Sequence, residues 1–89
     1  MKAHELLAQP GAWTQHTRAR NSKGKMVRTF DEDACSWCLV GALEKCYESK
    51  YHIPRNRVHQ ELQTWPTSWN DEPERTQEEV VALLKELDL

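Results

Sequence analysis

The chain has 89 residues, of which 38% are hydrophobic and 29% are charged, a composition that suits one small folded domain. This size excludes a large multi-substrate enzyme, and no apolar stretch approaches the ~18 residues of a membrane-spanning helix. The first residues lack the apolar segment of a signal peptide, and the three cysteines, an odd number, favour free thiols in a reducing cytoplasm.

The net charge of −2 hides an uneven distribution along the chain. Residues 1–30 hold six basic side chains and one acidic, a net +5, whereas residues 31–89 hold six basic and thirteen acidic, a net −7. This asymmetry predicts one cationic and one anionic surface, which would steer the molecule toward a charged partner. The alternative is that the basic segment packs beside the acidic helices and is neutralised by them.

The N-terminal third predicts a short helix followed by a β-hairpin. Residues 3–9 can form a helix, which Pro10 and Gly11 terminate. Over residues 13–30 the side chains alternate as in strands, and Gly24 suits the positive φ of the turn between them. We expect a two-stranded basic hairpin that lies on the helices, because an isolated hairpin is only marginally stable.

An apolar face with spacings of three and four predicts a central helix from residue 34 to about residue 48. It follows an acidic run at residues 31–33, which suits the positive end of the helix dipole. Gly41 lies in the middle of this helix, where it costs about 1 kcal/mol relative to alanine. This cost indicates that another backbone packs closely there.

Two further helices are predicted in the C-terminal half. Pro54 lies in the first turn of the first of them, which continues to Trp65. Residues 66–73 are rich in turn-forming residues and therefore predict a loop. Thr76 and Glu79 match a capping box at the start of the last helix. The expected fold class is therefore α+β, a single domain over residues 1–89 with three main helices, a short N-terminal helix and one hairpin.

Three short motifs point to a family resemblance: W-C-L-V-G-A-L at Trp37–Leu43, W-N-D at Trp69–Asp71 and R-T-Q-E-E-V at Arg75–Val80. With the turn at Ala19–Gly24, they resemble a family of small uncharacterised proteins found in phages, prophages and actinobacterial genomes. The resemblance covers roughly residues 5–88. It implies a phage or mobile-element origin but no activity, and Cys35 and Cys46 depart from its pattern.

The cysteines suggest a zinc site, with the candidate ligands Cys35, Cys38, Cys46 and His52. Cys38 and Cys46 would lie about 12 Å apart along one helix, so four ligands could not converge. A redox role is disfavoured by the acidic run before Cys35, because carboxylates oppose formation of a thiolate. We therefore expect neither a metal nor another cofactor.

Cys38 near the start of a helix is also a candidate nucleophile of a small hydrolase. Such a thiol needs a general base, for which His16, His52 and His59 are the candidates. The apolar neighbours of Cys38 instead favour a buried, unreactive core cysteine. We expect no catalytic residue and keep the hydrolase as the least favoured alternative.

The candidate partner-binding site is the basic hairpin, whose cations are Arg18, Arg20, Lys23, Lys25 and Arg28. Trp69 is a candidate apolar anchor, because tryptophan is favoured at binding hot spots. The structural alternative for Trp69 is that it closes the core while its Asn and Asp neighbours form the turn. The alternative for the cations is that they belong to an ordinary solvated hairpin and contact no partner.

We expect a non-enzymatic cytoplasmic protein that binds a host macromolecule, and we expect this partner to be a protein, on which the chain acts as an inhibitor or adaptor. Nucleic-acid binding through the same hairpin is the alternative, although a pI of about 6.1 speaks against it. No sequence motif indicates homo-oligomerisation.

Overall fold

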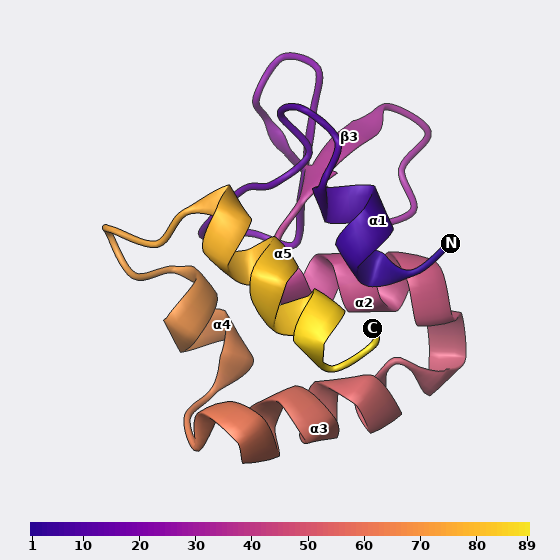
Figure 1. The fold of residues 1–89 in the computed structure, drawn as a ribbon. Helices are drawn as coiled ribbons and strands as arrows, with labels where there is room; N and C mark the ends of the chain where they lie inside the picture. The colour runs from indigo at the N-terminus through magenta and orange to yellow at the C-terminus, as the bar shows by residue number, and fades with distance from the viewer.

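The computed structural model describes residues 1–89 and shows the predicted α+β class (Figure 1). The helices are α1 (Ala3–Leu7), α2 (Leu39–Tyr47), α3 (His52–Leu62), α4 (Pro66–Asn70) and α5 (Gln77–Glu86), with a 3₁₀ turn, η1 (Glu48–Lys50), after α2. The strands are β1 (Ala19–Asn21), β2 (Met26–Val27) and β3 (Ala34–Trp37). In Figure 1 the sheet lies at one end of the molecule, α3 at the other, and α2 between them.

The sheet has three antiparallel strands in the order β2-β1-β3. The predicted hairpin is confirmed: Ala19 pairs with Val27, and the turn contains Gly24 at φ 78°. The prediction of a strand from Trp13 was wrong, because β1 begins only at Ala19. The chain before it turns at His16, which has a positive φ of 69°, and only Trp13 forms an isolated bridge.

The predicted start of the central helix was also wrong, because Ala34–Trp37 form β3 and the helix begins at Leu39. β1 would otherwise expose one edge, and β3 pairs with that edge, aligning Trp37 with Ala19. A short apolar segment satisfies strand and helix spacing alike, so the pattern could not distinguish them. The sheet therefore has one more strand than the predicted hairpin.

The predicted loop at residues 66–73 contains a helix as well. α4 occupies its first five residues, with Pro66 in the first turn, where its missing N–H leaves no bond unmade. Only residues after Asn70 form the connection to α5. The third predicted helix correspondingly ends at Leu62, before Trp65.

The core forms around α2, whose Leu39 and Leu43 are fully buried. α1 and α5 pack side by side against each other, and α1 packs on α2, so Leu7 and Leu84 are buried at this junction. α3 contributes mainly Val58, which agrees with its thin apolar stripe. No helix has both the length and the apolar character needed to cross a bilayer.

The close approach predicted at Gly41 is confirmed. A Cβ atom on this residue would lie 2.1 Å from the carbonyl oxygen of Arg18. The same carbonyl accepts a hydrogen bond from the backbone N–H of Cys38, at 3.2 Å. Gly41 thus lets the segment entering β1 lie directly against the first turn of α2.

Candidate functional site

Arg18, the first of the predicted hairpin cations, is directed at the helices. Its guanidinium forms an ion pair with Glu44 of α2 at 2.9 Å and lies 5.6 Å from the centre of the Tyr51 ring. Burial lowers the pKa of Arg18, but Tyr51 and Glu44 outweigh this effect, and the pKa is raised overall. Arg18 is therefore a permanent cation held by the body of the protein, as the self-neutralisation alternative expects.

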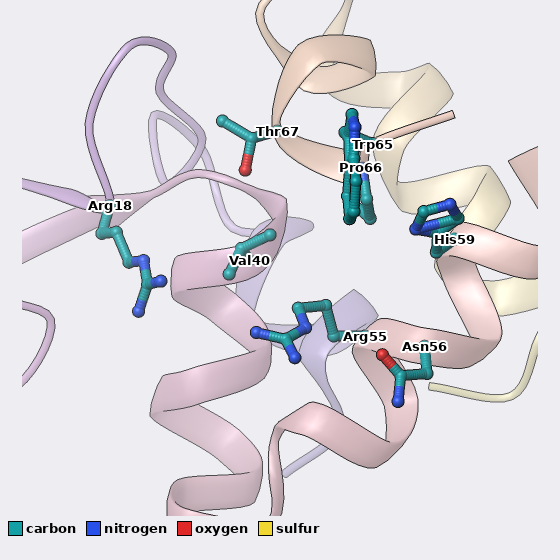
Figure 2. A pocket seen from close by; sticks show the side chains of 8 residues that line it. All are labelled: Arg18, Val40, Arg55, Asn56, His59, Trp65, Pro66 and Thr67. Atoms are coloured by element: carbon teal, nitrogen blue, oxygen red, sulfur yellow. The ribbon is translucent and has the colours of Figure 1, made fainter. Parts of the chain in front are cut away.

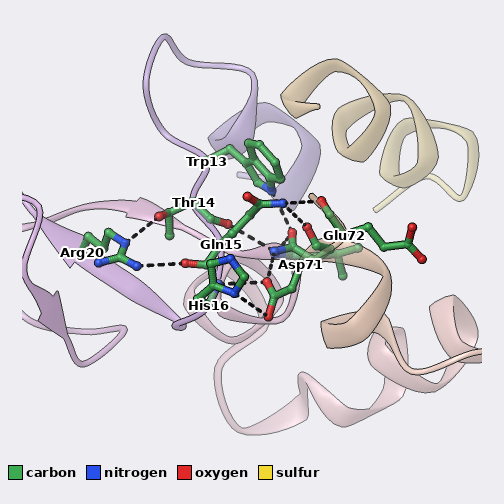
Figure 3. A network of polar contacts seen from close by, with 9 residues as sticks. Trp13, Thr14, Gln15, His16, Arg20, Asp71 and Glu72 are labelled. Atoms are coloured by element: carbon green, nitrogen blue, oxygen red, sulfur yellow. Dashed lines mark hydrogen bonds and ion pairs between the residues drawn. The ribbon is translucent and has the colours of Figure 1, made fainter. Parts of the chain in front are cut away.

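Arg20 is used inside the fold (Figure 3). Its guanidinium donates to the Thr14 hydroxyl at 2.9 Å, the Gly24 carbonyl at 3.0 Å and the Gln15 carbonyl at 3.1 Å. These three bonds join the hairpin turn to the segment before β1. The structure therefore gives Arg20 a positioning role in the hairpin itself.

The other three predicted cations, Lys23, Lys25 and Arg28, are exposed and form no side-chain hydrogen bond or ion pair within the protein. Two large apolar side chains of the same segment are also exposed, Met26 at 69% and Phe30 at 53%. We call these five residues the hairpin surface. It combines free cations with unburied apolar groups.

Acidic residues border the hairpin surface. Asp31, Glu32 and Asp33 follow directly in the chain and are exposed. Asp33 lies beside the turn, because its carboxylate accepts a weak hydrogen bond from Ser22 at 3.3 Å. The local charge is therefore mixed, and the +5 of residues 1–30 does not produce a uniformly cationic face.

Trp69 lies in α4, half-buried against the core, and Arg75 covers its ring. The Arg75 guanidinium lies 3.8 Å from the ring centre, and its Nε donates to the Trp69 carbonyl at 3.0 Å. The packing of Trp69 against the core agrees with the structural alternative for this residue. The expected turn at its neighbours was wrong, because Asn70 lies in α4 and its side chain bonds to Trp13, Leu39 and Thr14. The exposed tryptophan of the chain is Trp65, at 68%.

Asn70, the second residue of that motif, is fully buried and has all its side-chain groups bonded. Its Oδ1 accepts from the Trp13 indole at 2.7 Å and from the Leu39 backbone at 3.0 Å. Its Nδ2 donates to the Thr14 carbonyl at 3.2 Å and to Asp71 at 2.9 Å. Asn70 thus connects the segment before β1, the start of α2 and the end of α4.

Asp71 completes this polar network (Figure 3), accepting from the His16 backbone N–H at 2.9 Å. Its other carboxylate oxygen lies 3.9 Å from His16 Nδ1. Cys38 lines a small cavity of about 120 Å³ with these two residues. Of the three histidines considered for the hydrolase, the structure therefore brings only His16 to the cavity of Cys38.

The thiol of Cys38 has a structural role at this position. It is 4% exposed, and its Sγ accepts a hydrogen bond from the Gly41 N–H at 3.3 Å, which caps α2. Burial raises the pKa of Cys38, so its thiolate is disfavoured. Both properties argue against a nucleophile. No three His, Cys, Asp or Glu side chains gather where they could hold a metal ion.

A larger cavity, of about 270 Å³, opens between α2, α3 and the start of α4 (Figure 2). Arg55, Asn56 and His59 line it from α3, and Trp65 and Thr67 line it from the opposite side. Arg18 and Val40 close its third side, next to the cavity of Cys38. No carboxylate lines this cavity, which we call the arginine pocket.

The arginine pocket was not predicted from the sequence. Arg55 and His59 are four residues apart on one helix, a spacing that places them on one face and was a usable signal. Arg18 comes from a segment far away in the chain, and no local pattern indicated that it would join them.

The fold and these sites define a small α+β domain whose family motifs form its internal contacts. Residues 1–87 match the model of a family of unknown function, DUF6197, and the chain belongs to this family. No curated protein and no solved structure matches the chain.

Proposed function

We propose that this protein is a non-enzymatic binding protein that docks on another protein through the hairpin surface. The observation that carries the proposal is the exposure of Met26 and Phe30 beside three cations that have no partner inside the molecule. Methionine and aromatic residues are enriched in the cores of protein interfaces. Lysines and arginines around them accelerate the approach to an acidic surface.

The mixed charge of the hairpin favours a protein over a nucleic acid as the partner. A phosphate backbone would be repelled by Asp31, Glu32 and Asp33, which border the cations. An acidic protein surface with an apolar recess can accommodate Met26 and Phe30 while pairing with Lys23 and Lys25. We therefore propose a partner of that chemistry.

The resemblance of the motifs to phage and prophage proteins supports a further part of the proposal. We take the chain to originate from a phage or mobile element and its partner to be a protein of the host cytoplasm. A small domain of this kind would act there by covering a surface of the partner, as an inhibitor or adaptor does.

The test compares a hairpin variant with a matched control. The double variant M26S/F30S removes the two exposed apolar groups, and I53S removes Ile53, which is 56% exposed on α3. Because all three side chains are exposed, both variants should fold. Capture from host extract with the wild-type protein identifies the partner, and titration calorimetry then measures each affinity.

We expect M26S/F30S to weaken binding at least about tenfold and I53S to leave it unchanged. Charge reversal in K23E/K25E should slow association and reduce its salt dependence. Equal affinity of the wild type and M26S/F30S would refute the proposal. Binding of DNA or RNA with a steep salt dependence would instead support the nucleic-acid alternative.

A further inference from the structure

We infer that the arginine pocket binds a nucleoside monophosphate, either free or as the phosphorylated 5′ end of a single strand. The pocket shares no residue with the hairpin surface, so this inference stands independently of the proposed docking function. Three features of the pocket carry it: an unpaired guanidinium, an open aromatic face and a fitting size.

The unpaired guanidinium belongs to Arg55. Its side chain is half-buried, yet it forms no hydrogen bond or ion pair, and Figure 2 shows it extending into the pocket. A guanidinium has five N–H donors in a planar fork, which suits the oxygens of a phosphate. Partly desolvated donors without a partner favour an anion at this position.

Tyr51 holds the two arginines of the pocket. The Arg55 guanidinium lies 5.3 Å from the ring centre of Tyr51, and the Arg18 guanidinium lies 5.6 Å from it. The two like charges are thus kept near one aromatic ring, and only Arg18 is compensated, by Glu44. The contact with Tyr51 positions the uncompensated Arg55 guanidinium before a ligand arrives, which lowers the entropic cost of binding an anion.

The aromatic face belongs to Trp65. The residue is 68% exposed, and His59 packs against its ring edge to face, with ring centres 4.4 Å apart and an interplanar angle of 76°. A contact of this geometry supports the indole and leaves one of its faces open. Stacking of a nucleobase on an exposed tryptophan contributes about 1–3 kcal/mol.

The size of the pocket selects the ligand. Its volume of about 270 Å³ lies just below the ~300–1,000 Å³ of pockets for drug-sized molecules, so one nucleotide fits better than a larger cofactor. Asn56 and Thr67 supply an amide and a hydroxyl, groups that can bond to the edge of a base or to the sugar. The absence of a lining carboxylate suits a ligand with a dianionic phosphate.

The test is titration calorimetry of the intact protein with five probes: adenosine 5′-monophosphate, adenosine, inorganic phosphate, and a short oligodeoxyadenosine with and without a 5′ phosphate. We expect the monophosphate to bind at least about tenfold more tightly than adenosine or phosphate alone. No binding of the monophosphate, or equal binding of inorganic phosphate, would overturn the inference.

The oligonucleotides distinguish the two sources of the ligand. Tighter binding of the 5′-phosphorylated strand than of the mononucleotide assigns the pocket to a strand end, and equal binding assigns it to a free nucleotide. If the strand without a 5′ phosphate bound as tightly as the strand with one, the inference would be overturned. The pocket would then not recognise a phosphate monoester.

Variants locate the site. R55Q and W65A should each weaken the monophosphate about tenfold or more. The matched controls K50Q and I53A change an exposed cation of η1 and an exposed apolar residue of α3 outside the pocket, and should bind as the wild type does. Thermal melting verifies that each variant is folded. Unchanged affinity of folded R55Q would contradict the assignment.

Discussion

Gly41 shows at the scale of a single residue how a local cost is offset by a tertiary contact. Glycine in a helix is unfavourable by about 1 kcal/mol relative to alanine. Here the missing side chain lets the carbonyl of Arg18 approach to within 2.1 Å of the place of a Cβ atom. The same carbonyl also accepts a hydrogen bond from the N–H of Cys38, so the contact links the residue before β1 to the N-cap of α2.

The substitution G41A therefore tests two opposite expectations. Helix propensity alone predicts that alanine raises the free energy of unfolding by about 1 kcal/mol. The steric clash with the Arg18 backbone predicts a loss of about 1–3 kcal/mol instead, because neither backbone can move freely. Urea unfolding measures the sign, and a stabilised variant would show that the contact is looser than described.

The capping box of α5 shows how an element is stabilised by its own first turn. The Thr76 hydroxyl accepts from the Glu79 N–H at 3.2 Å, and the Glu79 carboxylate accepts from the Thr76 N–H at 2.9 Å. The hydrogen bond from the Thr76 backbone lowers the pKa of Glu79 below its ordinary value of 4.5. The folded state therefore prefers the charged carboxylate.

This preference predicts a pH dependence of stability. The contribution of Glu79 is present above its unfolded pKa, near 4.5, and is lost as the pH falls through the lower pKa of the folded state. E79Q should thus lose less stability than the wild type between pH 7 and about pH 3, as melting temperatures would show. The neighbour E78Q is the control and should follow the wild type; equal slopes for all three proteins would contradict the prediction.

At the scale of the whole molecule, one buried amide connects the sheet end to the helical end. Asn70 bonds to Trp13, Thr14 and the first residue of α2, and it is itself the last residue of α4. Trp37 of β3 bonds through its indole to the Thr29 carbonyl at 3.1 Å. Trp13 and Trp37 thus report on the junction between sheet and helices.

We therefore predict that sheet and helices unfold together. Urea transitions followed by tryptophan fluorescence and by far-UV circular dichroism should coincide. N70A should lower the free energy of unfolding by about 2–3 kcal/mol and shift both transitions equally, because it leaves buried donors and acceptors unpaired. The exposed control N56A should change it by less than about 0.5 kcal/mol. Separate transitions in the wild type would contradict this prediction.

The sequence by itself determined the features that depend on a few neighbouring residues. These are the α+β class, the hairpin turn at Gly24, the close approach at Gly41 and the capping box of α5. Each follows from a local conformational preference or from a periodic apolar face.

Only the tertiary structure decided the role of Ala34–Trp37, the use of each cation and the arginine pocket. Ala34–Trp37 became a strand because β1 offers it an edge, which no local pattern reveals. Arg18 forms an ion pair because Glu44, 26 residues away in the sequence, lies beside it. Arg55 forms no ion pair because no carboxylate lines the pocket into which it extends. The partner of a charge depends on how distant segments pack, and a linear sequence does not contain those distances.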